Sequence, residues 1–148
     1  MKFRKATMSD LTEIVLMLAN DPLGKSREDV SNVEKYTKAL ARIAADENQE
    51  LIVVENEQGV TVGTFQLTFI QYLTHQGSLR VLVEAVRVKE NFRGQGIGEK
   101  IFQWIIHHAK EKGADLLQLT SDKQRPDAIR FYTKLGFAAS HEGLKLKL

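Results

Sequence analysis

The sequence predicts a mixed α+β domain. Its expected core is a central twisted mixed β-sheet, with an antiparallel N-terminal half, a β-α-β crossover behind it and helices on both faces. Three observations lead to this prediction: two helical patterns near the N-terminus, three β-rich segments joined by short turns, and an alternation of helix and strand patterns after them. The expected element order is β-α-α-β-β-β-α-β-α-β.

The N-terminal part of the chain is predicted to form one short strand followed by two helices. Residues 2–6 have strand composition, and residues 10–19 place apolar side chains at helical spacing. Ser9 stands where a helix N-cap is expected, and residues 20–24 contain a proline and a glycine that end the helix. A second amphipathic segment carries its apolar face on Val30, Val33, Tyr36, Leu40 and Ile43.

The period of the apolar pattern changes after this segment. Residues 51–55, 60–70 and 79–89 are rich in β-branched and aromatic side chains, and glycine-containing turns at residues 56–59 and 75–78 separate them. Strands joined by connections this short run antiparallel. The middle of the chain is therefore the antiparallel half of the predicted sheet.

The last third of the chain alternates helix and strand. A helix is predicted over residues 97–112, and Gly113 ends it. Its inner stripe is Ile97, Ile101, Ile105 and Ala109. Residues 116–120 form a strand and residues 126–135 a helix. Leucines alternate with lysines over residues 144–148, which predicts a closing strand.

Length and charge predict one domain without a nucleic-acid partner. The chain of 148 residues fits a single domain, residues 1–148, with one core. The 21 basic and 19 acidic side chains leave a net charge of only +2. Because no basic arm or patch stands out, direct nucleic-acid binding has little electrostatic support.

The absence of cysteine excludes a thiolate nucleophile, disulfides and a zinc-thiolate site. It also suits a reducing cytosol, so a cytoplasmic protein is expected. The N-terminus lacks the apolar core of a signal peptide, and no apolar run approaches the roughly 20 residues that span a bilayer. No membrane association is expected.

A glycine-rich loop between a predicted strand and a predicted helix is the feature of the sequence that says most about function. Gly94, Gly96 and Gly98 let the backbone approach a ligand closely, and Arg93 adds a charged fork at the rim. The helix that follows presents unpaired N–H groups and a partial positive charge at the same point. The local chemistry predicts a phosphate site, with a tight turn carrying incidental glycines as the structural alternative.

Two nucleotide-binding patterns fit this loop less well. A P-loop needs Lys-Ser/Thr after its last glycine, whereas Glu99 and Lys100 follow Gly98. A dinucleotide fingerprint is G-x-G-x-x-G, whereas this loop reads G-x-G-x-G. Asp122 stands where a ribose-binding acid is expected, so a dinucleotide-binding domain is kept as an alternative. The hairpin strands before the loop and the short chain speak against it.

Two motifs resemble those of the GNAT superfamily of acyl-CoA N-acyltransferases. Residues 93–98, RGQGIG, match the family's R/Q-x-x-G-x-G/A, and residues 128–137, AIRFYTKLGF, are similar to its A-x-x-F/L-Y-x-x-x-G-F. They occur in the family's order, with one helix and one strand between them. The resemblance runs from residue 83 to residue 137 and implies a GNAT-like fold.

The resemblance implies that acetyl-CoA is the co-substrate. Its acetyl group would pass to a primary amine of a small molecule by direct attack in a ternary complex, without a metal. The pantetheine arm would pair with the backbone of Val86 and Val88 like an added strand, and Phe131 and Lys134 would line the cofactor. The pyrophosphate would lie on the loop, which assigns to cofactor binding Arg93, Gly94, Gln95, Gly96, Gly98 and Glu99.

Glu84 is the first candidate catalytic residue. It stands four residues before Val88, about 13 Å upstream at a rise of about 3.3 Å per residue, which is comparable to the reach of a pantetheine arm. An ammonium must lose a proton before it attacks a thioester, and a glutamate there can act as general base, directly or through water. The structural alternative is a salt-bridged or edge-exposed glutamate.

Tyr132 is the second candidate catalytic residue. It shares the sheet-facing side of its helix with Ala128 and Leu135, so packing alone would account for an isolated tyrosine. Its match to the family's tyrosine implies instead that the phenol donates a hydrogen bond or a proton to the departing thiolate of CoA.

Arg125 departs from the family pattern, in which an asparagine often contacts the cofactor. It is a poor N-cap ahead of Pro126, and it can meet a cofactor phosphate or an acidic group on the substrate. Residues 120–132 also resemble the aminoalkylphosphonate acetyltransferase branch. That resemblance points to a small anionic amine as the acceptor.

The histidines do not predict a metal site, and the sequence leaves a second function and the oligomeric state open. His107 and His108 are adjacent and cannot form an i, i+4 metal pair, so solvent exposure is expected for both, and His75 and His141 are expected at the surface. A non-catalytic acyl-CoA-binding regulatory protein is the second function kept open. Family habit points to a homodimer.

Overall fold

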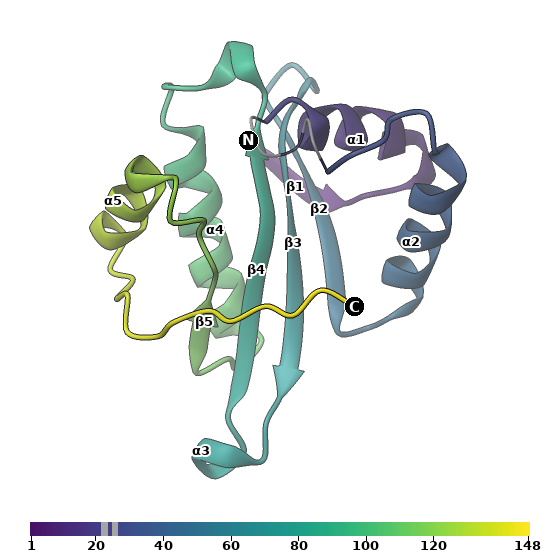
Figure 1. Ribbon diagram of the computed structural model, residues 1–148. Coiled ribbons are helices and arrows are strands. Elements are labelled where there is room, and N and C mark those ends of the chain that lie inside the picture. The colour runs from purple at the N-terminus through teal and green to yellow at the C-terminus, as the bar shows by residue number, and fades with distance from the viewer. Residues whose placement is uncertain (22–23, 25–26) are drawn as a thin grey trace. The chain divides into compact units, whose positions relative to one another are not determined.

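A five-stranded sheet in the order β1-β2-β3-β4-β5 forms the centre of the first of two units, Met1–Gln118. The structure is a computed structural model that describes residues 1–21, 24 and 27–148. The second unit is Leu119–Leu148, and a single domain over the whole chain stays a prediction. The elements are β1 Lys2–Lys5, η1 Met8–Asp10, α1 Leu11–Ala19, α2 Val33–Ala45, β2 Gln49–Glu55, β3 Thr61–Gln71, α3 Thr74–Gly77, β4 Leu79–Val88, η3 Glu90–Phe92, α4 Ile97–Glu111, β5 Leu116–Gln118 and α5 Pro126–Lys134 (Figure 1).

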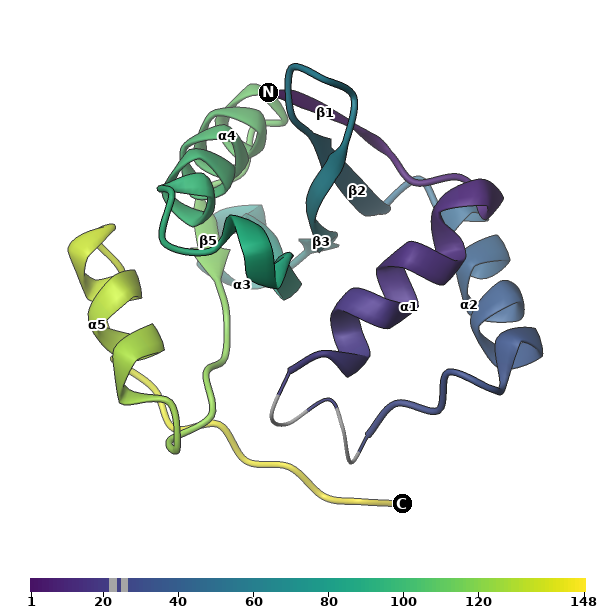
Figure 2. The same ribbon diagram turned by 90° about the horizontal axis from the view of Figure 1, so that it is seen from above.

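The sheet is mixed, as the sequence predicts. Strands β1 to β4 are antiparallel neighbours, and β5 runs parallel to β4 after the α4 crossover. Helices cover both faces (Figure 2). On one face α1 packs Ile14 and Met17 against Val53 of β2. On the other, Trp104 of α4 meets Phe65 of β3 with ring centroids 5.6 Å apart. The predicted inner stripe of α4 is buried.

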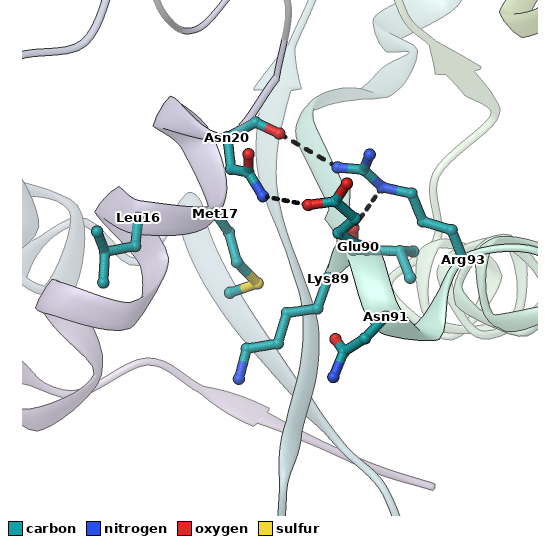
Figure 3. Close-up of a pocket in the computed structure, with 8 residues that line it drawn as sticks. Leu16, Met17, Asn20, Lys89, Glu90, Asn91 and Arg93 are labelled. Carbon is teal, nitrogen blue, oxygen red and sulfur yellow. Dashed lines mark hydrogen bonds between the residues drawn. The ribbon is translucent and has the colours of Figure 1, made fainter.

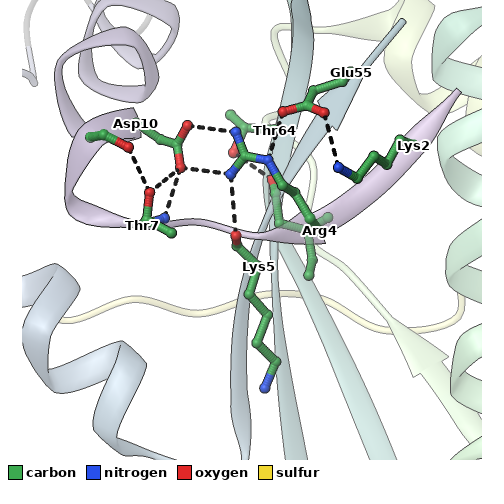
Figure 4. A network of polar contacts seen from close by, with 9 residues as sticks. Lys2, Arg4, Lys5, Thr7, Asp10, Glu55 and Thr64 are labelled. Atoms are coloured by element: carbon green, nitrogen blue, oxygen red, sulfur yellow. Dashed lines mark hydrogen bonds and ion pairs between the residues drawn. The ribbon is translucent and has the colours of Figure 1, made fainter. Parts of the chain in front are cut away.

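The first helix begins differently from the prediction: Asp10, and not Ser9, is the N-cap residue of α1, and its carboxylate caps the preceding turn η1 instead of α1. One Asp10 carboxylate oxygen accepts the N–H and the hydroxyl of Thr7, each at 2.8 Å. Arg4 of β1 donates to both Asp10 oxygens at 2.8 Å and to Glu55 at 2.6 Å (Figure 4). This guanidinium holds the pKa of Asp10 well below its usual range. The capping box is local, with Thr7 as the N-cap of η1 and Asp10 three residues later, and the prediction for Ser9 overlooked it.

The closing strand predicted for residues 144–148 is wrong. No strand follows α5 in the described chain, and Leu144, Leu146 and Leu148 are exposed. An alternation of leucine and lysine favours a strand only where a neighbouring strand supplies hydrogen bonds, and no described strand pairs with this segment. The proline expected to end the first helix, with residue 23, lies outside the described residues.

His108 is not solvent-exposed, contrary to the prediction. Its Nε2 lies 2.7 Å from a carboxylate oxygen of Glu50, which is buried on the α4 face of the sheet. Its ring also stacks on Trp104 with centroids 4.5 Å apart. A buried carboxylate requires such a partner, which a helical pattern does not reveal. The exposed histidines are the other three, His75, His107 and His141, as expected.

Candidate active site

The glycine-rich loop joins the turn η3 to α4. Gly94 and Gly96 have φ values of +76° and +75°, in the left-handed region that glycine adopts without strain, and Gly96 is the N-cap of α4. No atom lies within 4 Å of where a Cβ would stand on either residue. The loop backbone is therefore open to a ligand.

Unpaired donors gather on this loop. The N–H groups of Gly94, Gln95 and Gly96 donate to no group in the described part of the chain. The first turn of α4, which contains Gly98 and Glu99, adds the N–H groups that every helix leaves without an acceptor. A left-handed turn followed by the N-terminus of a helix of 15 residues is a favourable place for an anion.

Arg93 uses its guanidinium on backbone carbonyls. Its Nε donates to the carbonyl of Val88 at 3.1 Å and an Nη donates to the carbonyl of Asn20 at 3.2 Å (Figure 3). The side-chain amide of Asn20 in turn donates to Glu90 at 3.1 Å. These bonds tie the end of α1 to the end of β4.

A pocket of about 420 Å³ lies beside this tie. Its apolar lining comes from α1 and β4, and its charged lining comes from the turn after β4 (Figure 3). The lining residues are Leu16, Met17, Asn20, Val88, Lys89, Glu90, Asn91 and Arg93. Lys89 is also paired with Glu13 of α1.

The C-terminal half of β4 has one edge without a paired strand. Among the described strands, β5 pairs with β4 only from Arg80 to Leu82, whereas β3 pairs with β4 as far as Val88. Lys89 N–H donates to a carbonyl of β3 at 2.9 Å. Because backbone groups alternate in direction along a strand, those of Val86 and Val88 point away from β3, toward the free edge.

A β-bulge separates the two halves of β4. Two residues of β4, Ala85 and Val86, stand opposite one residue of β3, Phe65. Ala85 has a φ of +53°, a left-handed conformation that costs a non-glycine residue roughly 1 kcal/mol. Such a bulge bends the strand and turns the side chains that follow it.

The bulge places Glu84 and Arg87 on the same face of the sheet. Glu84 pairs with Gln66 and Arg87 pairs with Thr64, and these partners stand two residues apart on β3. This is the face that carries α1, since Thr64 also pairs with Val53. Glu84 is exposed, and no described residue makes a hydrogen bond or ion pair with its carboxylate.

The remaining predicted site residues belong to the second unit, Leu119–Leu148. Phe131 and Tyr132 are partly buried on α5, with ring centroids 5.5 Å apart, and Phe137 lies 5.9 Å from Tyr132. Arg125 precedes α5 and makes no side-chain cap bond, as expected of a poor N-cap. Lys134 is the last residue of α5 and is exposed.

Three residues of the first unit are near the loop or Glu84 but are absent from the predicted set. They are Asn20 and Glu90, which brace the loop, and Arg87. Of these three, only Arg87 could have been singled out from the sequence, because it is a charged residue inside an apolar strand. Among the described residues no cluster of His and carboxylate groups could hold a metal, and no helix there is long and apolar enough to cross a bilayer.

The family model of the acetyltransferase (GNAT) family matches residues 15–137. The chain belongs to this family. Membership makes this GNAT protein an acyltransferase in a family that uses acetyl-CoA, and it decides against the dinucleotide-binding alternative.

Curated relatives match only part of their length. The chain is 35% identical over 83 residues to aminoalkylphosphonate N-acetyltransferase of Salmonella typhimurium, covering 56% of this chain and 53% of the relative. It is 34% identical over 79 residues to thialysine N-epsilon-acetyltransferase of Bos taurus, covering 53% and 46%. The chain thus spans about half the length of these relatives.

A solved structure matches the GNAT chain along its whole length. It is described as a transcriptional regulator from Bacillus halodurans C-125, and it is 50% identical with a TM-score of 0.93. The match covers 99% of both chains.

Proposed function

We propose that this GNAT protein transfers the acetyl group of acetyl-CoA to a primary amine of a small molecule, by direct attack in a ternary complex. The observation that carries the proposal is the continuity of the loop with the free edge of β4. Unpaired amides at Gly94, Gln95 and Gly96 suit a pyrophosphate. The outward backbone groups of Val86 and Val88 suit the amides of a pantetheine arm, which would add to the sheet as a strand does.

Glu84 is proposed as the general base and Tyr132 as the hydrogen-bond or proton donor to the leaving thiolate. The exposure of Glu84 supports its role, because a base has to reach the ammonium of the acceptor. Arg93, Gly98, Glu99, Arg125 and Phe131 complete the proposed cofactor site. The pocket beside Arg93 widens the surface available to a ligand at this end of β4.

An anionic amine is the proposed acceptor. The partial match to a relative named for aminoalkylphosphonates supports this class, as does the resemblance over residues 120–132.

The test of the proposal starts with turnover. The protein is incubated with acetyl-CoA and a panel of amines, and release of the free CoA thiol is measured beside acetyl-CoA binding by calorimetry. Release that depends on the amine supports the proposal. Binding without release from any amine contradicts it.

The glycine loop is tested by Gly96→Val, with Gly59→Val as its matched control. Both glycines have a φ of +75° and open space around a Cβ, but Gly59 lies in the turn between β2 and β3. Both variants should lose similar stability from left-handed strain. Only Gly96→Val should weaken acetyl-CoA binding, on the order of tenfold or more, because its side chain covers the loop amides. Equal binding by the two variants would contradict the loop assignment.

Tyr132→Phe keeps the ring that contacts those of Phe131 and Phe137 and removes only the hydroxyl group. Its turnover should fall on the order of 10- to 100-fold while acetyl-CoA binding is kept. Tyr36→Phe is the control, since that phenol donates to Glu28 beside α2. Full activity of Tyr132→Phe would exclude the donor role.

A non-catalytic acyl-CoA-binding regulator is the second candidate. The name of the Bacillus halodurans structure favours it, as that protein is described as a transcriptional regulator and shares the whole fold. It predicts tight acetyl-CoA binding, no turnover with any amine, and no effect of Glu84→Gln on binding.

A further inference from the structure

Contacts with two described residues hold Arg87 beside the free edge of β4. Its Nη1 donates to the carbonyl of Val86 at 2.9 Å, and its Nε lies 3.4 Å from a carboxylate oxygen of Asp21. Asp21 follows α1 and is 5% exposed, whereas the Arg87 side chain keeps 20% of its surface exposed. The guanidinium is therefore fixed in position and still reached by solvent.

The distance from Arg87 to Glu84 is set by the bulge. Their partners on β3 stand two residues apart, so the two backbones are about 7 Å apart along the sheet at about 3.4 Å per residue. Without the extra residue at Ala85, simple alternation would turn Arg87 to the α4 face. With it, a carboxylate and a guanidinium share one face next to the edge proposed for the pantetheine arm.

This pair of opposite charges is complementary to a small zwitterion. An ammonium approaching Glu84 would leave an anionic group of the same molecule near Arg87, provided that only a few bonds separate them. A guanidinium carries five N–H donors, so contacts to Asp21 and to the Val86 carbonyl do not exhaust its capacity to donate to a carboxylate or a phosphonate. A neutral amine would leave that interaction unused.

We propose that Arg87 determines acceptor specificity by binding the anionic group of the acceptor, so that the substrate class is a short amine with a carboxylate or phosphonate a few bonds from its nitrogen. The inference rests on the proposed acetyl transfer and assigns the recognition of its acceptor.

The test compares three amines of similar length: 2-aminoethylphosphonate, β-alanine and the neutral 2-aminoethanol. The wild-type protein should acetylate at least one anionic amine with a kcat/KM on the order of tenfold or more above that of the neutral amine. A comparison of 2-aminoethylphosphonate with β-alanine shows whether the site prefers a phosphonate or a carboxylate. Arg87→Gln should abolish this preference through KM, and Arg87→Lys should keep part of it.

Arg80→Gln is the matched control. Arg80 lies on the same face of β4, four residues before Glu84, with its guanidinium 4.2 Å from the ring centroid of Tyr72. Its loss should leave the preference unchanged. Asp21→Asn keeps a hydrogen-bond acceptor of the same size beside Arg87 and removes only the negative charge, so it should lower KM for the anionic amines alone.

Three outcomes overturn the inference. One is equal acetylation of the neutral and anionic amines by the wild-type protein, which leaves the proposed function standing. A second is an equal loss for all amines in both Arg87→Gln and Arg87→Lys, which indicates a structural role. The third is acetyl-CoA binding without turnover of any amine, which overturns the proposed function as well.

Discussion

From Arg80 to Leu82, β4 lies between β3 and β5, and Val81 in this part has no exposed surface. From Val83 to Val88 the same strand is paired with β3 alone, carries a bulge, and exposes Glu84. The first half resembles the interior of any mixed sheet, and the second gathers the features of a binding site. The difference comes from the short β5 and from the one extra residue of the bulge in β4. A small change in the backbone is therefore enough to distinguish a binding edge from the interior of a sheet.

The largest expected effect comes from the open half. Glu84→Gln should lower kcat on the order of 100- to 1000-fold, because a carboxamide cannot accept the proton of the amine. Binding of acetyl-CoA, followed by calorimetry, should not change. Glu57→Gln, an exposed glutamate of the β2–β3 turn, serves as the control. Full turnover by Glu84→Gln would place the base elsewhere and remove the chemical distinction between the halves.

Substitutions in the half of β4 that is paired on both sides should lower the free energy of unfolding and leave catalysis unchanged. Val81→Ala removes buried methyl groups and should lower the free energy of unfolding by about 2 kcal/mol. Urea denaturation measures this loss, and KM for acetyl-CoA should stay within about twofold. Leu73→Ala, at a position 94% exposed beyond the end of β3, should cost less than about 0.5 kcal/mol. A large rise in KM for Val81→Ala would break the comparison.

Acid should weaken the scaffold through Asp10, away from β4. Arg4 lowers the pKa of the Asp10 carboxyl, so its stabilisation is complete above the unfolded pKa near 4 and is lost as the pH falls toward the lower folded value. Asp10→Asn should cost about 1–2 kcal/mol at pH 7. Urea melts between pH 5 and pH 2 should show a flatter loss for the variant than for the wild type. Parallel losses would assign the acid sensitivity to other carboxylates.

The smallest expected effect is at the boundary between the halves. Ala85→Gly should raise stability by about 0.5 kcal/mol, since relief of roughly 1 kcal/mol of left-handed strain is partly offset by the greater freedom of glycine in the unfolded chain. Ala85→Val should lower stability by about 1 kcal/mol or more, because a β-branched side chain tolerates this conformation less well. The same urea melts measure both, and stabilisation by valine would contradict the strained bulge.

Periodicity was enough to predict the sheet order of the middle strands and the long helix. The stripe of α4 and the antiparallel pairing of β2 to β4 follow from local pattern and turn length, and both are confirmed. The closing strand at residues 144–148 failed, because a strand depends on a partner that its own residues do not encode.

The sequence also predicts only those features of the candidate site that depend on local residues. The loop glycines at 94 and 96 show in the sequence, and their left-handed conformations confirm the positive φ expected of glycines in this loop, while their role in cofactor binding stays a prediction. The bulge at Ala85 gave no such signal, since alanine rarely marks a left-handed position. Simple alternation would therefore turn Glu84 and Arg87 to opposite faces, and only the pairing register brings them together.

The free edge of β4 has a consequence for the protein at high concentration. An unpaired strand edge is a template for the backbone of another molecule and so a starting point for aggregation. Here the edge is bent at Ala85, and the outward carbonyls of Val86 and Val88 already accept bonds from Arg87 and Arg93. A neighbouring copy therefore meets a kinked edge whose outward carbonyls already have partners, which disfavours the addition of a second regular strand.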